Sequence, residues 1–212
     1  YTEMEKYAFN GRFLIIGCGS IGQGVLPLLL KHFTVSPERI TIVTSDSRGE
    51  DVAREYGVRF IVRPVTPENY EEILRKQLGS GDFLVNVSVD VSSAALIEYC
   101  QKNGILYIDT VMEPWRGYYT DPSLSASQRS NYALREAALA LRSLHIHGPR
   151  PTNVLAHGAN PGLVSHFVKQ ALLNIARDTG YKVKTPTTHE AWAKLAQDLG
   201  VKVIHIAERD TQ

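Results

Sequence analysis

The spacing of three glycines near the N-terminus limits the fold of this chain more than any other feature. Gly17, Gly19 and Gly22 follow a continuous apolar run at 12–17 and open a helical pattern at 20–32. A glycine turn between a buried strand and a helix is typical of dinucleotide-binding domains. Gly17 would permit the tight turn, Gly19 the close approach of a pyrophosphate, and Gly22 the packing of helix against strand.

The start of this helix would hold the phosphates. Ser20 and Ile21 lie in the first helical turn, where unpaired N–H groups and the helix dipole attract anions. The loop therefore predicts a nicotinamide dinucleotide cofactor. The alternative is a glycine-rich turn that binds nothing.

Strand-like and helix-like patterns alternate from the glycine turn to about residue 109. This order predicts an α/β fold, a Rossmann-type doubly wound parallel sheet covered by helices on both faces. The strands are expected at 12–17, 39–44, 59–62, 82–87 and 105–108. The helices are expected at 20–32, 50–56, 67–78 and 92–103, with Pro27 kinking the first or shifting its turn.

The chain changes character after residue 109. We expect 1–150 to form the NAD-binding Rossmann domain and 151–212 to be the beginning of a second, α+β substrate or catalytic domain. We also expect the native polypeptide to continue beyond Gln212. Irregular chain is expected at 110–124, a helix at 127–142, a linker at 147–151, a strand at 153–156, a helix at 161–179 and a strand at 201–207.

Composition argues against several classes of partner. Lys and Arg number 23 against 22 Asp and Glu, and a net charge of +1 favours no polyanion such as nucleic acid. The apolar runs are far shorter than the roughly 18 residues of a membrane span. With two cysteines, one of them (Cys18) in the nucleotide loop, a reducing cytoplasmic location is expected. The histidines show no ligand spacing, so no metal site is assigned.

The second predicted strand ends in residues that bear on the choice between NAD and NADP. Asp46 could bind the ribose hydroxyls, which favours NAD. Ser45, Ser47 and Arg48 could instead hold a 2′-phosphate, which favours NADP. An ordinary polar turn is a third reading, and the sequence alone leaves all three open.

Polar residues also end the fourth and fifth predicted strands. Asn86 and Ser88 lie at the end of the fourth strand, and Asp109 follows the fifth. Since the carboxyl ends of parallel strands face the ligand crevice, we expect all three to line the cofactor site. Strand-terminal polar residues that only cap helices are the alternative.

Two further segments carry candidate substrate-binding groups. Glu113 and Trp115 follow the fifth strand, and a carboxylate beside an aromatic ring suits an ammonium group. A solvated Glu113 and a core Trp115 are the alternative. Asn160 lies in a second glycine-containing turn and offers both a donor and an acceptor, although it could simply cap the following helix.

Several blocks of unusual sequence follow one another along almost the whole chain. They are GCGSIGQG from Gly17, VTPENY at 65–70, NVSVDVSS at 86–93, YIDTVMEPW at 107–115, SNYALREA at 130–137, GANPGLVSHFVKQAL at 158–172 and HIAERDTQ at 205–212. In this order, the blocks closely resemble bacterial homospermidine synthases, a family related to saccharopine dehydrogenase.

The resemblance implies an aminobutyl transfer that recycles NAD. Putrescine is oxidised to an imine and ammonia is lost. A second putrescine then forms a new imine, which is reduced to homospermidine. The resemblance favours NAD over NADP and implies a homodimer.

The resemblance also implies roles for three residues. Glu113 and Glu208 would line the diamine pocket, and Asn160 would lie near the nicotinamide and substrate. It does not assign Trp115 to the family's pocket tryptophan. Two other functions stay open: an NAD(P)-dependent saccharopine dehydrogenase-like oxidoreductase acting on an amino acid, and a non-catalytic dinucleotide sensor.

Overall fold

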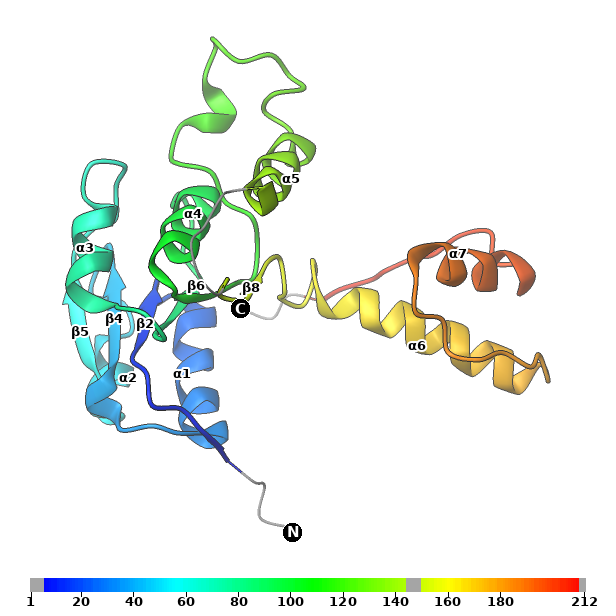
Figure 1. Cartoon of the computed structure of the whole chain (residues 1–212), viewed down its shortest axis with the longest axis horizontal. Helices are drawn as coiled ribbons and strands as arrows, with labels where there is room; N and C mark the ends of the chain where they lie inside the picture. The colour runs from blue at the N-terminus through cyan, green and yellow to red at the C-terminus, as the bar shows by residue number, and fades with distance from the viewer. Residues whose placement is uncertain (1–5, 144–149, 210–212) are drawn as a thin grey trace. The chain divides into compact units, whose positions relative to one another are not determined.

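The protein consists of two compact units, at 1–156 and 157–212. A computed structural model describes residues 6–143 and 150–209 (Figure 1). Most of the expected 147–151 linker lies outside the described residues. The first unit ends at Ala156 rather than at residue 150, because the short strand β8 (Asn153–Val154) pairs with β7 (Leu106–Asp109).

The first unit is built on a six-stranded parallel sheet in the order β5-β4-β2-β6-β7-β8. Of these six strands, β2 comes first along the chain, and it lies at the centre of the sheet. Between β5 and β6 the chain crosses from one side of β2 to the other. This is the strand order of the Rossmann fold, and it confirms the predicted fold class. The remaining strands are β2 (Phe13–Ile16), β4 (Ile40–Thr44), β5 (Arg59–Val62) and β6 (Phe83–Asn86).

Strand β2 is buried on both faces, as its unbroken apolar sequence predicts. Leu14 and Ile16 join a cluster with residues of α3 and α4, whereas Phe13 and Ile15 join a cluster with residues of α1 and α2. Figure 1 shows the two pairs of helices on opposite sides of the sheet. Their bounds are α1 (Ser20–His32), α2 (Glu50–Glu55), α3 (Tyr70–Gln77) and α4 (Ser93–Asn103).

Smaller elements complete the first unit. Pro27 lies inside α1, which continues past it as one helix. The two-residue strands β1 (Tyr7–Ala8) and β3 (Phe33–Thr34) pair beside the main sheet and carry no sequence signal of their own. The predicted helix at 127–142 is α5 (Asn131–Ala140), followed by a 3₁₀ turn at Leu141–Ser143. Further 3₁₀ turns lie at Pro37–Arg39 and Tyr118–Thr120.

The second unit contains two helices, α6 (Leu163–Asp178) and α7 (His189–Asp198), packed around Leu172, Ala176 and Leu195. The predicted strand at 201–207 is wrong: the described residues of this unit include no strand with which it could pair. Helix α7 was not predicted.

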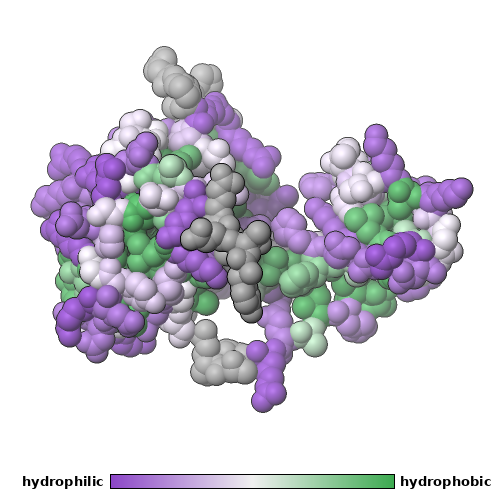
Figure 2. Space-filling view, turned by 90° about the horizontal axis from the view of Figure 1, so that it is seen from below, coloured by the Kyte–Doolittle hydropathy of each residue, from purple (hydrophilic) through white to green (hydrophobic). Residues whose placement is uncertain are grey.

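Figure 2 shows apolar surface on the second unit. No helix in the described ranges is long and apolar enough to cross a membrane.

A buried carboxylate fixes the amino-terminal edge of the sheet. Asp82 is 7% exposed and accepts hydrogen bonds from Arg12 N (2.7 Å), Arg12 Nε (2.9 Å) and Gly79 N (2.7 Å). We expect Asp82→Asn to lower the free energy of unfolding by roughly 1–3 kcal/mol, since its amide cannot accept from all three donors. Urea denaturation measures this change.

The matched control is Asp51→Asn, which alters a carboxylate that is 92% exposed and paired with Arg54. This variant should stay within about 0.5 kcal/mol of the parent. Equal losses in the two variants would contradict the assignment of Asp82 as a structural carboxylate.

Candidate functional site

The turn from β2 into α1 has the geometry that a phosphate-binding loop requires. Gly17 has a φ of 94°, and a Cβ atom there would lie 2.8 Å from the carbonyl oxygen of Val87. A Cβ on Gly22 would lie 2.6 Å from the carbonyl oxygen of Gly17. At Gly19 no atom of the described residues lies within 4 Å of the added Cβ, so the backbone there is open to a ligand.

The N-terminus of α1 faces this open position. Gly19 is the N-cap residue and provides no side chain to cap the helix. The amides of Ser20, Ile21 and Gly22 lie in the first turn, where an α-helix has no internal acceptors for them. The loop therefore presents N–H groups and a partial positive charge at one place.

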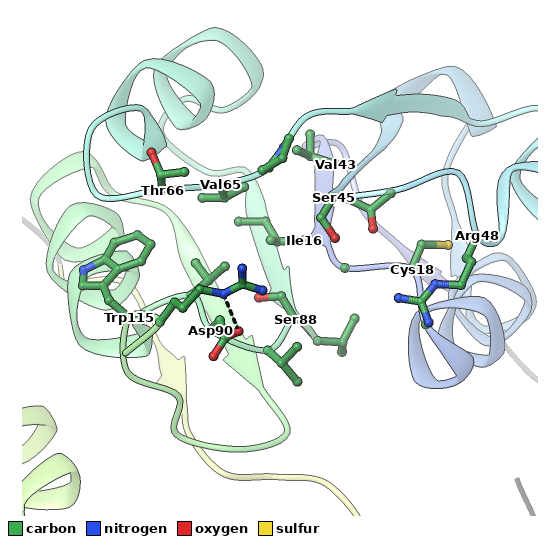
Figure 3. A pocket seen from close by; sticks show the side chains of 18 of the residues that line it. Ile16, Cys18, Val43, Ser45, Arg48, Val65, Thr66, Ser88, Asp90 and Trp115 are labelled. Atoms are coloured by element: carbon green, nitrogen blue, oxygen red, sulfur yellow. Dashed lines mark hydrogen bonds and ion pairs between the residues drawn. The ribbon is translucent and has the colours of Figure 1, made fainter. Parts of the chain in front are cut away.

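A cavity of about 430 Å³ lies against the loop (Figure 3). Its walls come from the carboxyl ends of β2, β4 and β6 and from the segments that follow β5 and β7. In the view of Figure 3, Arg48 and Trp115 lie at opposite ends of the cavity. The lining also includes Gly17, Cys18, Gly19, Thr44, Ser45, Thr66, Ser88, Asp90 and Arg116.

Asp46 and Arg48 form an ion pair at one end of this cavity. Arg48 Nη2 lies 2.7 Å from Asp46 Oδ2, and the Arg48 backbone amide donates to Asp46 Oδ1 over 2.9 Å. The hydrogen bonds from Arg48 lower the pKa of Asp46. Ser45 and Arg48 belong to the lining of the cavity, and Asp46 does not. The residues on which the choice between NAD, NADP and an ordinary polar turn depends therefore belong to one small cluster.

Asn86 is the last residue of β6 and Ser88 follows the strand, but of the two only Ser88 lines the cavity. Asn86 is 2% exposed, and its Oδ1 accepts a hydrogen bond of 2.6 Å from the Ser88 hydroxyl. The amide side chain of Asn86 therefore orients Ser88 rather than facing the cavity itself.

Asp109 does not line the cavity either. It is 1% exposed and accepts from the Tyr107 hydroxyl (2.8 Å) and from the backbone amide of Ala156 (2.5 Å). Burial raises the pKa of Asp109, and these donors oppose the shift. The expectation that Asp109 faces the cofactor is corrected: residue 109 ends β7 with its side chain turned into the protein, where it has internal donors.

The substrate candidates in the first unit surround Asp90, which was not predicted. Glu113 is partly buried; burial raises its pKa, a backbone hydrogen bond from Asp90 lowers it, and repulsion by the Asp90 carboxylate raises it. Arg116 Nε donates to Asp90 Oδ2 over 3.1 Å, shown as a dashed line in Figure 3. Trp115 lines the cavity and packs against Tyr70 with ring centroids 5.5 Å apart. Asp90 has a positive φ of 61°, which no pattern in the sequence predicts.

Asn160 and Glu208 lie together in the second unit. The Asn160 side-chain amide donates a hydrogen bond to Glu208 Oε1, and both residues are exposed. Asn160 does not cap α6, whose N-cap residue is Gly162. The two positions are 48 residues apart in sequence, so the contact is a product of the fold. The described residues contain no group of three metal-ligating side chains.

The glycine loop gives a matched set of substitutions. Gly19→Ala should raise the dissociation constant for NAD at least about tenfold while leaving the free energy of unfolding within roughly 0.5 kcal/mol. Its Cβ fills only the space a pyrophosphate would use. Gly24→Ala, an exposed change one turn into α1 that meets nothing within 4 Å, is the control and should not alter binding. Titration calorimetry and urea denaturation separate the two effects, and equal binding by both variants would contradict the assignment.

The chain is similar to known proteins in both fold and sequence. The sequence profile of the saccharopine dehydrogenase NADP-binding domain matches residues 13–148, more than half of the chain. The structure of homospermidine synthase from Legionella pneumophila in complex with NAD superposes with a TM-score of 0.83 and 42% identity. That match covers 93% of this chain and 40% of the other.

Two curated homospermidine synthases are similar along the whole sequence. The protein from Blastochloris viridis is 50% identical over 215 residues, and the one from Mesorhizobium japonicum 45% identical over 208. These alignments cover 100% and 96% of this chain but 45% and 42% of the relatives. The chain thus spans less than half the length of the relatives it matches. It belongs to the family of saccharopine dehydrogenase NADP-binding domains and is a homologue of homospermidine synthases.

Proposed function

We propose that the polypeptide carrying this sequence is an NAD-dependent homospermidine synthase that joins two putrescine molecules with loss of ammonia. The observation that carries the proposal is the 50% identity that extends over both units of the chain. A similarity confined to the Rossmann unit would support dinucleotide binding alone.

The cavity of the first unit fits NAD. The open backbone at Gly19 and the start of α1 suit the pyrophosphate, and Thr44 and Ser45 offer hydroxyls where the adenosine ribose would lie. Ser88 would contact the cofactor at the end of β6. When bound, NAD would supply the redox chemistry, taking up hydride from the diamine and returning it to the imine.

Glu113 would hold an ammonium group of the diamine. Burial disfavours its charged form most strongly and raises its pKa, although a backbone hydrogen bond from Asp90 opposes this shift, so a bound cation would stabilise the ionised carboxylate. An ammonium group pairs well with such a carboxylate, and a fixed spacing between anchoring groups selects the length of the diamine.

Asn160 and Glu208 would serve the substrate from the second unit. Glu208 accepts the Asn160 amide and keeps a second carboxylate oxygen for an ammonium group. Asn160 can orient an amine without adding charge. A carboxylate and a neutral amide suit a cationic substrate better than an amino acid carboxylate.

Two other functions remain as alternatives. An amino acid dehydrogenase would need a cation for the substrate carboxylate, and the nearest one to Trp115 in the cavity lining, Arg116, is paired with Asp90. A non-catalytic sensor would bind NAD without turnover. The resemblance to the family also leads us to propose a cytoplasmic location and a homodimer.

The decisive test uses the complete polypeptide with putrescine and a catalytic amount of NAD. Chromatography should show homospermidine and ammonia, with no net accumulation of NADH. Accumulation of NADH with an amino acid but not with putrescine would overturn the diamine reaction in favour of an amino acid dehydrogenase. Binding of NAD without any turnover would identify the sensor.

Glu113→Gln should reduce kcat/KM for putrescine by roughly 100-fold, since a neutral amide cannot balance the ammonium charge. Because the pKa of Glu113 is raised, the parent should lose putrescine affinity as the pH falls through a range above the usual titration of Glu. The variant should lack this pH dependence. Glu136→Gln, which alters an exposed carboxylate paired with Arg135, is the control. Unchanged kinetics in Glu113→Gln would contradict the assignment.

The ion pair between Asp46 and Arg48 yields a test of cofactor choice. We expect Asp46→Asn to reduce the preference for NAD over NADP about tenfold, because it removes a negative charge that repels a 2′-phosphate. Arg48→Ala should have the opposite effect. Dissociation constants for the two cofactors measure the ratio, and identical ratios in the parent and both variants would show that this pair does not select the cofactor.

A further inference from the structure

A chain of buried hydrogen bonds runs from the cavity wall to the end of the first unit. Ser88 lines the cavity, and its hydroxyl donates to Asn86 Oδ1 (2.6 Å). Asn86 Nδ2 donates to the Tyr107 hydroxyl (3.2 Å), which donates in turn to Asp109 Oδ2 (2.8 Å). The other oxygen of Asp109 accepts the backbone amide of Ala156 (2.5 Å).

This chain of hydrogen bonds has a defined direction because Asp109 can only accept. Tyr107 is 1% exposed and Asp109 1% exposed, so water does not offer replacement partners. An ionised carboxylate accepts from the Tyr107 hydroxyl and from the Ala156 amide at once. An asparagine could accept only one of them and would present N–H groups to the other donor.

The last residue in the chain of hydrogen bonds has an unusual backbone. Ala156 has a φ of 50°, in the left-handed region that residues with a side chain rarely adopt. It is the last residue of the first unit, and the next residue begins the second. The bond to Asp109 therefore holds an unfavourable conformation at the point where the chain leaves the Rossmann unit.

A second buried group fixes the backbone of the candidate substrate residue. Ser93 is fully buried at the start of α4, and its hydroxyl donates to the carbonyl oxygen of Val111 over 3.3 Å. The same oxygen accepts the backbone amide of Glu113 over 3.0 Å. Ser93 thus fixes the backbone at Glu113, whereas the buried cluster of Asn86, Tyr107 and Asp109 fixes the backbone at Ala156.

We infer that Asp109 is a positioning residue that couples occupation of the dinucleotide cavity to the backbone at Ala156. A dinucleotide that contacts Ser88 would fix the Ser88 hydroxyl, and the buried cluster would transmit this order to Asp109 and the Ala156 amide. The inference rests on the proposed binding of NAD in this cavity. It gives Asp109, which does not touch the cavity, a role in linking cofactor binding to the start of the unit that carries Asn160 and Glu208.

Amide hydrogen exchange of the complete polypeptide, with and without NAD, tests this coupling. In the parent, NAD should slow exchange of the Ala156 amide about tenfold. In Asp109→Asn, the affinity for NAD should stay within about threefold, but the slowing at Ala156 should disappear. Tyr107→Phe keeps the aromatic ring but interrupts the same chain of hydrogen bonds, so it should also abolish the slowing at Ala156. This variant provides the test if Asp109→Asn does not fold.

Asp82→Asn is the matched control, because Asp82 is a buried carboxylate of the same sheet with no link to Ala156. It should destabilise the protein and yet keep the effect of NAD at Ala156. Slowing that persists in Asp109→Asn or Tyr107→Phe, or that is absent from the parent despite NAD binding, would overturn the coupling alone. Failure of the parent to bind NAD would overturn both the coupling and the proposed function.

Discussion

The turn between β2 and α1 approaches the residues after β6 more closely than any side chain at Gly17 would allow, and the cavity depends on this approach. A Cβ atom on Gly17 would lie 2.8 Å from the Val87 carbonyl oxygen. The Gly17 amide also donates to the Val43 carbonyl over 2.9 Å, which fixes the turn to β4. The carboxyl ends of β2, β4 and β6 therefore lie close together. The glycine loop, Ser45 and Ser88 consequently line the same cavity.

Burial at the carboxyl edge of the sheet has a second consequence. Asn86, Tyr107 and Asp109 lie in a sheet whose interior is mostly apolar, where an unsatisfied polar group costs roughly 1–3 kcal/mol. The three side chains avoid this cost by bonding to one another, to Ser88 and to the Ala156 amide. These bonds hold the three side chains in a defined arrangement at this edge of the sheet.

The charged groups around the cavity are held less firmly. Arg48 and Arg116 are 79% and 88% exposed, and each is paired with one aspartate. Exposed ion pairs contribute little to stability, so a charged ligand can replace one partner at small cost. The rigid part of the site thus comes from backbone and buried polar groups, and the adaptable part from solvated ion pairs.

The sequence by itself determined the Rossmann sheet, helix 20–32 and the positions of the three glycines, because apolar runs and glycine spacing act over short stretches of chain. It also indicated Glu113, Asn160 and Glu208 through resemblance to a family. Only the tertiary structure decided that β8 joins the sheet, that the 201–207 segment forms no strand, and that Asp109 points inward while Asp90 lines the cavity. Strand pairing and the burial of a polar side chain both depend on partners distant in sequence, such as Ala156 for Asp109, and no local pattern specifies those partners.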